Sequence, residues 1–418
     1  MSGEAKAPPL AALVKAGEGQ SEAIAINDHI FQVNDVSNAY LVTTSDGDVL
    51  VNTGMNFSGE KNKTLFDPVR TGPLRYIFLT QAHLDHFGGL PAIREPETKV
   101  VTQARFPETW QFFYDLHAYL TKRSGKLWAF NRKGPNPPPA PPVDIDILVE
   151  DRQAFTVGNR SFELISTQGG ESLCASVVWM PEEKTVFTGN LFGPVWLAMP
   201  NLTTTRGDKP RLVVNYLASL ERVRALEPEL LITGHGDPIR GKERIRADLD
   251  RIHGAVSYIR DHTIAGMNAG KSVHQLMREI TLPDDLKIGE FHGTVRWAVR
   301  AIWDENSGWF HYEDGTTGLY GVPRSSVHGD LVELAGGASA LARRASDHLV
   351  AGGALEAIHL LDIALDGEPG NKDALTVKKG ALEKLLADSG QSNLSETMWL
   401  RVEIAITEAA LNPETPAG

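Results

Sequence analysis

Apolar residues in the first 245 positions fall into short runs that are separated by turns. The runs at 23–28, 29–35, 38–44 and 48–54 are rich in Val, Ile, Tyr and Phe, residue types that favour strands. The sequence SDGD at 45–48 joins the last two runs and predicts a hairpin. The polar stretch at 59–70 predicts a helix, and residues 74–80 form the next apolar run.

The alternation of strands and helices continues as far as residue 234. Apolar runs predict strands at 98–103, 144–149, 152–157, 161–167, 176–180, 184–189 and 229–234, and helices are predicted at 107–123 and 211–226. The proline-rich segment 134–144 cannot continue a helix or a central strand, so we interpret it as a surface loop. Two strand-rich halves, each closed by helices, predict an α/β fold in the form of a four-layer αββα sandwich.

The periodicity changes after residue 245. Long stretches from 245–263 to 397–411 place apolar residues at i, i+3 and i+4, the spacing of amphipathic helices. Residues 339–369 and 371–390 predict helical hairpins. We therefore predict a flexible polar tail at 1–20, an α/β domain at 21–245 and an all-α domain at 246–418.

Composition and charge narrow the classes of function. The chain has 418 residues, of which 42% are hydrophobic and 22% charged, as is typical of globular proteins. A net charge of -12 argues against nucleic acid as a partner. No run reaches the roughly 18 apolar residues that a membrane span needs. The chain start lacks the pattern of a signal peptide, and a lone cysteine, Cys174, excludes an intramolecular disulfide. These features predict a cytoplasmic protein.

The stretch TQAHLDHFGGL at 80–90 is the segment whose side chains most clearly predict a metal-binding site. It follows an apolar run directly, and histidine and carboxylate side chains are ligands for divalent ions that leave a position for water. Further candidate side chains stand at the ends of later strand-like runs, so we expect all of them on one rim of the fold. The candidates are His83, Asp85, His86, Glu171, Asn190 and His235.

These motifs together resemble the metallo-β-lactamase superfamily. The pattern HxDHxGG at 83–89, the turn NTG at 52–54 and the sequence GHGDP at 234–238 carry the resemblance. Within the superfamily the chain resembles the alkylsulfatases of the SDS-degrading type, whose G-x-E element is reproduced at 169–171. Residues 201–207 resemble the arginine loop of that family, in which Arg206 would contact the sulfate. Residues 292–310 resemble part of its dimerisation domain.

The resemblance extends from about residue 23 to about residue 390 and implies a two-part metal site. A carboxy-terminal sterol-carrier-like domain of longer members has no counterpart within the 418 residues. The first half-site would consist of Gln81, His83 and Glu171, and the second of Asp85, His86 and His235. The bridging acid of the family falls on Asn190.

Amides therefore replace a histidine and a carboxylate, and amide oxygens are weak ligands for zinc-like ions. We predict one divalent ion in the second half-site, with zinc preferred over iron or manganese, and we do not expect a second ion. The predicted metal-binding residues are His83, Asp85, His86, Glu171 and His235.

The predicted function is hydrolysis of an ester or sulfate ester by water that a metal ion activates. Asp85, Glu171 and His83 are predicted to be catalytic, with Glu171 as general base, whereas Arg206, Gln81 and Asn190 are predicted to bind the substrate. The same two-His-one-carboxylate set also suits a non-haem iron redox enzyme. A non-catalytic assembly scaffold is the third alternative.

The predicted partners are a small anionic or hydrophobic substrate and a second copy of the chain, bound through the helical domain. An aromatic set could line the substrate pocket or pack on the core. It consists of Trp110, Phe112, Phe113, Tyr114, Tyr119 and Trp128. Histidines outside the motifs, including His292, are predicted to be structural.

Overall fold

The computed structural model describes residues 10–127 and 138–412. By internal contacts the described chain forms two compact units. The first comprises residues 10–120 and 138–305, and the second comprises residues 121–127 and 306–412. The boundaries predicted at residues 20 and 245 stay predictions.

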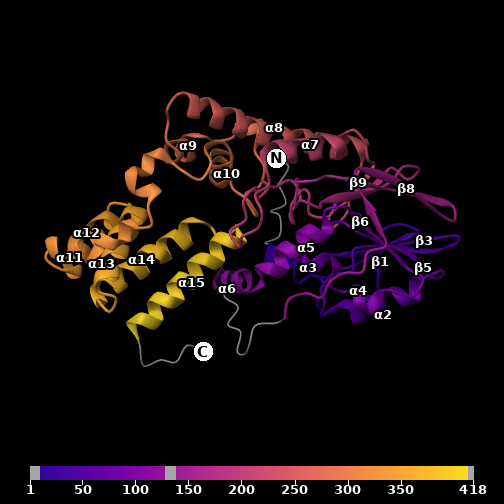
Figure 1. Cartoon of the computed structure of the whole chain (residues 1–418), viewed down its shortest axis with the longest axis horizontal. Helices are drawn as coiled ribbons and strands as arrows, with labels where there is room; N and C mark the ends of the chain where they lie inside the picture. Colours follow the sequence, from indigo (N-terminus) through magenta and orange to yellow (C-terminus); the bar gives the residue numbers. More distant parts are fainter. Residues whose placement is uncertain (1–9, 128–137, 413–418) are drawn as a thin grey trace, which may run out of the picture. The chain divides into compact units, whose positions relative to one another are not determined.

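Two mixed β-sheets form the centre of the first unit (Figure 1). The seven-stranded sheet runs in the order β1 to β7, and the six-stranded sheet in the order β13-β12-β11-β10-β9-β8. The strands of the first sheet are β1 (Ile24–Ala25), β2 (Ile30–Val33), β3 (Ala39–Thr44), β4 (Gly47–Val51), β5 (Leu74–Leu79), β6 (Lys99–Gln103) and β7 (Ile147–Val149). Those of the second sheet are β8 (Arg152–Val157), β9 (Arg160–Ser166), β10 (Ser176–Met180), β11 (Thr185–Phe187), β12 (Leu230–Ile232) and β13 (Ile239–Arg240).

Each apolar run that predicted a strand has become one, because these runs supply the buried faces of the sheets. Strand β3 is buried at all six positions and pairs antiparallel with β4 across the predicted hairpin. Gly47 in that hairpin has a φ of 96°, a conformation that a glycine adopts without strain. Strands β4, β5 and β6 are parallel to one another, so their carboxyl ends share one edge of the sheet.

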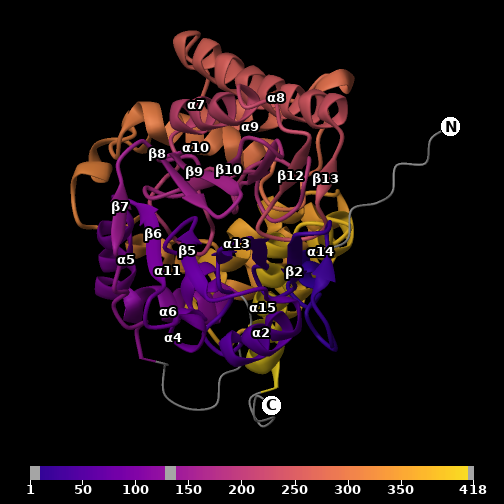
Figure 2. The same ribbon diagram turned by 90° about the vertical axis from the view of Figure 1, so that its right-hand side faces the viewer.

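Helices cover the outer face of each sheet and complete the four layers that the sequence predicted (Figure 2). One apolar cluster lies between the sheets and includes Phe78, Phe162 and Phe187. A second joins the first sheet to α2–α5, and a third joins the second sheet to α7–α10. The helices are α1 (Leu10–Leu13), α2 (Gly59–Phe66), α3 (Leu84–Phe87), α4 (Leu90–Ile93), α5 (Phe106–Asp115), α6 (His117–Leu127), α7 (Val213–Arg224), α8 (Lys242–Asn268), α9 (Val273–Glu279) and α10 (Val295–Ser307).

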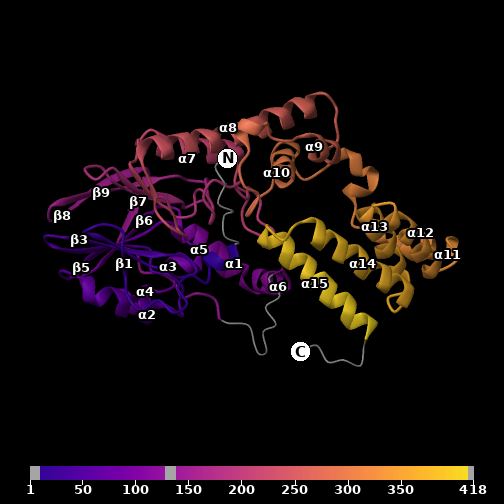
Figure 3. The same cartoon turned by 180° about the vertical axis from the view of Figure 1, so that it is seen from behind.

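The second unit consists mainly of helical hairpins, as the sequence predicted (Figure 3). Its helices include α11 (His328–Leu334), α12 (Ala338–Val350), α13 (Ala354–Gly367), α14 (Lys372–Asp388) and α15 (Leu394–Leu411). Small residues such as Ala342, Ala357 and Ala381 are fully or almost fully buried between helices and allow close approach. The side chains of Asn371 and Asn393 cap α14 and α15 by accepting from the backbone N–H three residues on. Short 3₁₀ turns of this unit lie at Tyr312–Asp314, Thr316–Leu319 and Arg324–Val327, and those of the first unit lie at Asp67–Val69 and Asp284–Leu286.

Candidate metal centre

The loop after β5 carries three of the predicted site residues. His83 stands at the start of the one-turn helix α3, with Asp85 and His86 inside it. The neighbouring turn after β4 holds this loop in place, because Asn52 Oδ1 accepts hydrogen bonds from the N–H and the hydroxyl of Thr80, at 3.0 and 3.1 Å. The NTG turn at 52–54 therefore stabilises the position of the loop that carries His83, Asp85 and His86.

The second sheet delivers the remaining side chains to the same edge of the fold. Glu171 lies between β9 and β10, Asn190 follows β11, and His235 follows β12. The last two turns are joined by a hydrogen bond of 2.7 Å from the N–H of Gly234 to the carbonyl of Gly189. The prediction that these strand ends meet is consistent with this geometry.

Asp85, His86 and His235 form a compact cluster. One carboxylate oxygen and one nitrogen from each ring lie within 4.8 Å of one another. Within residues 10–127 and 138–412, this is the group of His, Cys, Asp and Glu side chains whose spacing suits an ion. Its donors are the types that divalent transition metals prefer.

The protonation states of the three side chains in the cluster favour metal binding. Burial lowers the pKa of His86 to about 3, against the opposing effect of Asp85, and burial also lowers the pKa of His235. Both rings are therefore neutral and keep a lone pair. Burial raises the pKa of Asp85, but the nearby imidazoles outweigh it and hold that pKa below its ordinary value, so the carboxylate is ionised.

Two polar atoms beside the cluster provide a test of whether an ion fits. His235 Nδ1 and Asn190 Oδ1 are buried, and neither has a hydrogen-bond partner among the described residues. Gly234 leaves room for them, because a Cβ at that position would lie 2.3 Å from Asn190 Oδ1 and 3.1 Å from His86 Cε1. Buried polar atoms are rarely left unpaired, so a cation fits this half of the site.

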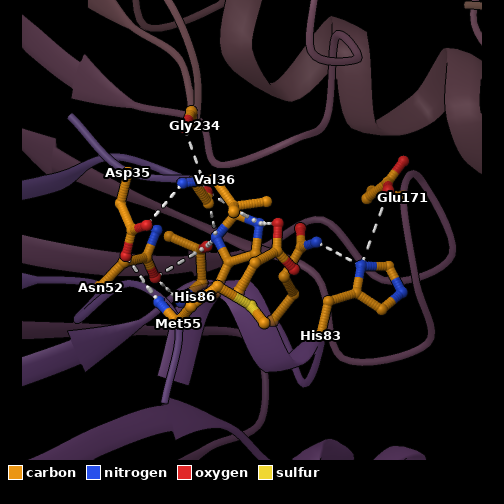
Figure 4. A network of polar contacts seen from close by, with 12 residues as sticks. Asp35, Val36, Asn52, Met55, His83, His86, Glu171 and Gly234 are labelled. Atoms are coloured by element: carbon orange, nitrogen blue, oxygen red, sulfur yellow. Dashed lines mark hydrogen bonds and ion pairs between the residues drawn. The ribbon is translucent and has the colours of Figure 1, made fainter. Parts of the chain in front are cut away.

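His83 belongs to a different network, and Figure 4 shows its ring pointing toward Glu171 and away from His86. Its Nδ1 is 2.5 Å from Gln81 Nε2 and 3.8 Å from Glu171 Oε1, and its Nε2 is 2.9 Å from Asp208 Oδ2. With Gln81 donating to Nδ1 and Nε2 donating to Asp208, both ring nitrogens are engaged. Burial raises the pKa of Asp208, but the hydrogen bond to His83 outweighs it and brings that pKa to about 2.

Arg211 supplies a fixed positive charge to the same network. Its Nη2 donates to Glu171 Oε1 at 2.8 Å, while Nε and Nη1 donate to the backbone carbonyls of Glu171 and Asn201. Burial raises the pKa of Glu171, and the charge of Arg211 opposes this effect. The acids of the first half-site thus have internal partners, and these residues fit a metal ion less well than the second half-site does.

Arg206 lies at the exposed side of the network. Its side chain is 37% exposed and its Nη2 is 3.8 Å from Asp208 Oδ2. The positive charge of Arg206 is also among the charges that lower the pKa of Asp85. Sequence reasoning found Arg206 but missed Asp208 and Arg211, although they belong to the same polar segment.

The aromatic segment divides between the site and the core. The ring of Phe113 contacts His83 edge-on with centroids 5.4 Å apart, and Lys209 Nζ lies 5.4 Å from the ring centre of Phe112. Trp110 packs against the core, whereas Tyr114 and Tyr119 are exposed. Trp128 lies outside the described residues.

Known proteins with this architecture were found by sequence and by structure. Residues 33–235 match the metallo-beta-lactamase superfamily, and residues 272–402 match the alkyl sulfatase dimerisation family. A linear primary-alkylsulfatase of Pseudomonas sp. (strain ATCC 19151) is 24% identical over 376 residues, covering 82% of this chain and 69% of that protein. The alkyl/aryl-sulfatase BDS1 of Saccharomyces cerevisiae is 22% identical, covering 86% of this chain and 60% of its own length.

The fold of a solved alkylsulfatase agrees with these matches. The stereoselective inverting sec-alkylsulfatase Pisa1 from Pseudomonas sp. superposes with a TM-score of 0.80 at 20% identity, covering 95% of this chain and 66% of that one. Residues 33–235 thus form a metallo-β-lactamase domain, and the chain shares its fold with the solved alkylsulfatase. A region that matches the alkyl sulfatase dimerisation family follows this domain, and the two relatives named above are an alkylsulfatase and an alkyl/aryl-sulfatase, which supports a hydrolase of this family. In the described ranges, no helix is both long and apolar enough to cross a membrane.

Proposed function

We propose that the protein is a metal-dependent hydrolase of sulfate esters that works with one divalent ion, held by Asp85, His86 and His235. The observation that supports the proposal best is the meeting of these three donors within 4.8 Å, with neutral imidazoles and an ionised carboxylate. An ion bound there would acidify a water molecule to supply the nucleophile. Zinc is the first choice for such a set, and manganese or iron are alternatives.

The chain's own side chains would orient the substrate and move protons. Arg206 is half-exposed and can hold the sulfate group by paired hydrogen bonds. Gln81 and Asn190 would contact substrate oxygens beside it. Glu171 would accept the proton of the attacking water, and His83, whose ring nitrogens are engaged by Gln81 and Asp208, would help to position it; the burial that raises the pKa of Glu171 makes it a better base than an exposed carboxylate.

A mononuclear iron redox enzyme is the second candidate. Two histidines and one carboxylate on one side of an ion leave open positions, which is the arrangement that non-haem iron oxygenases use. This candidate shares the metal site with the first and differs in the ion and in the reaction.

Elemental analysis of protein purified without added metal separates the candidates. About one zinc or manganese per chain, lost in the Asp85→Ala/His235→Ala variant, together with sulfate release from a linear alkyl sulfate, would support the hydrolase. A matched Asp261→Ala/His274→Ala variant, altered on α8 and α9, should keep both properties. About one iron would favour the redox enzyme. Two ions per chain would show that the first half-site also binds an ion. Protein without any metal would exclude both metalloenzymes and leave the non-catalytic scaffold as the remaining alternative.

We also propose that two copies associate through the second unit. Residues 272–402 match the alkyl sulfatase dimerisation family, and large apolar side chains are exposed between positions 309 and 334. They include Trp309 at 80%, Tyr312 at 74% and Tyr320 at 69% exposure. Large apolar side chains that are exposed close together in the sequence are typical of a segment that contacts another protein. A cytoplasmic location stays a prediction.

A further inference from the structure

The loop at 287–293, which precedes α10, is hydrogen-bonded to residues 197–199, which lead into the arginine loop at 201–207. Gly289 accepts a hydrogen bond of 2.7 Å from the N–H of Met199 and donates one of 3.0 Å to the carbonyl of Leu197. Gly293 donates to the carbonyl of Met199 at 3.0 Å. A Cβ on Gly293 would lie 2.2 Å from the carbonyl oxygen of Pro200, so only glycine permits this approach. All of these residues belong to the first unit.

His292 stands in this loop, next to the turn that carries Asn190. Its Nδ1 would lie 3.2 Å from a Cβ built on Gly193, and the N–H of Gly193 donates to the carbonyl of Asn190 at 2.8 Å. The Nδ1 atom is buried, while the residue as a whole is partly exposed. The Nδ1 edge of the ring thus lies inside the protein, beside the turn that carries Asn190.

The electrostatic surroundings of His292 are those of the candidate site. Loss of contact with water lowers the pKa of His292 well below its ordinary value, and the positive charges of Arg211 and Arg206 and the neighbouring His235 lower it further. The ring is therefore neutral near pH 7. A neutral imidazole still donates one N–H, which is the group that an anionic oxygen requires.

We propose that His292 is a substrate-binding residue, whose N–H donates a hydrogen bond to the tetrahedral oxyanion that Arg206 holds. The proposal rests on the sulfate-ester hydrolase proposed above and extends it beyond the matched residues 33–235. It also replaces the structural role that the sequence predicted for His292. The metallo-β-lactamase portion would then lack a part of its substrate site without the loop at 287–293.

Binding of inorganic sulfate and hydrolysis of a linear primary alkyl sulfate, both measured on the full-length metal-loaded protein, test the proposal. His292→Ala should weaken sulfate binding by about tenfold or more, because a hydrogen bond to a charged group is lost. The KM for the alkyl sulfate should rise by a similar factor with less change in kcat, since the contact is made before and during the reaction. Metal content should not change.

Two further variants separate binding from folding. His292→Gln keeps an N–H donor and should recover part of the affinity. His253→Ala removes a partly exposed histidine on α8 of the same unit and should behave as wild type. If His292→Ala lowers the melting temperature and the metal content in parallel with sulfate affinity, and His292→Gln recovers nothing, the role is structural and the proposal is overturned.

A double-mutant cycle tests whether the two residues share one ligand. If His292 and Arg206 contact the same oxyanion, the effects of His292→Ala and Arg206→Ala on sulfate affinity will not add. Additive effects would overturn the proposal. A wild-type protein that releases no sulfate would refute the proposed hydrolase, whereas an active wild type with an unchanged His292→Ala variant would refute this inference alone.

Discussion

Gly234→Ala is the sharpest single test of where the ion binds. The new Cβ would lie 2.3 Å from Asn190 Oδ1, 3.1 Å from His86 Cε1 and 3.2 Å from the carbonyl carbon of Gly189. Real Cβ atoms do not approach other heavy atoms within 3.0 Å, so Asn190 must move by most of an ångström. The residue has no positive φ, so the effect is steric and not a backbone strain.

The expected loss falls on metal binding more than on folding. Overpacking of this kind costs about 1–3 kcal/mol of stability. A displacement near an ångström at groups that adjoin the ion should weaken metal affinity about 10-fold to 100-fold and slow turnover by a comparable factor. Metal content after dialysis, sulfate release and calorimetric melting would be measured on the same preparation.

Gly266→Ala is a matched control. Its Cβ would also meet an atom at 2.3 Å, but that atom is Cδ2 of Leu276, the end of a flexible side chain within α8 and α9 packing. Alanine also gains about 1 kcal/mol of helix propensity over glycine, which offsets part of the clash. We expect this variant to keep its metal and its turnover. A Gly234→Ala protein with wild-type metal content and turnover would refute the placement of the ion.

Three other predictions concern stability, the ion and assembly. Arg70 Nη1 donates to Glu95 at 2.6 Å and holds the pKa of Glu95 below its ordinary value. Because the folded-state pKa is lowered, this contribution is present above the unfolded-state pKa and disappears as the pH falls through the folded-state pKa. Glu95→Gln should therefore lower the free energy of unfolding by roughly 1–2 kcal/mol at pH 7. Urea titrations should show that this difference from wild type becomes smaller in acid. A difference that does not change with pH would contradict the stabilising ion pair between Arg70 and Glu95. Chelation should lower the melting temperature of the wild type, because a bound ion stabilises the folded state by an amount that depends on the concentration of free ion and on its affinity. The melting temperature of Asp85→Ala/His235→Ala should not change. A wild type whose melting temperature is unchanged by chelation would count against a bound ion. Trp309→Glu should shift the sedimentation of the protein from dimer to monomer, whereas Phe57→Glu, at an equally exposed apolar site of the first unit, should not; an unchanged dimer would move the interface elsewhere.

The central strands were predictable because they bury nearly all of their side chains, as β3, β4 and β10 do at every position. A run such as AYLVTT at 39–44 has no polar face to confuse with a helix, and its turn carries the glycine that a hairpin needs. The positions of Asp85, His86 and His235 followed from the same reasoning, since each lies just after the end of a strand, β5 in the first sheet for Asp85 and His86 and β12 in the second for His235. In contrast, α3 and α4 have four residues each, too short for any periodic signal.

The first half-site could not be predicted in the same way. The pairing of His83 with Asp208 joins positions 125 residues apart, and that of Arg211 with Glu171 joins positions 40 apart. Neither partner follows a strand or belongs to a recognisable spacing, so only the folded chain brings them together. The position of His292 beside Gly193 could not be predicted for a related reason, because it depends on glycine contacts between two loops.

The difference between the two half-sites lies in where the positive charge comes from. In the first, Arg211 and Arg206 accompany the carboxylates of Glu171 and Asp208, and the guanidinium of Arg211 is buried and bound at three of its nitrogens. In the second, the carboxylate of Asp85 faces two imidazoles that burial keeps neutral, so an added cation is the group that would balance it. Gln81 and Asn190 offer only amide groups, which are weak ligands for zinc-like ions, to the half that already contains its own cations. This distribution of charge suits the proposed single ion and a neighbouring anion subsite, because Arg206 keeps an exposed side chain that can attract a sulfate while Arg211 balances the buried carboxylate of Glu171.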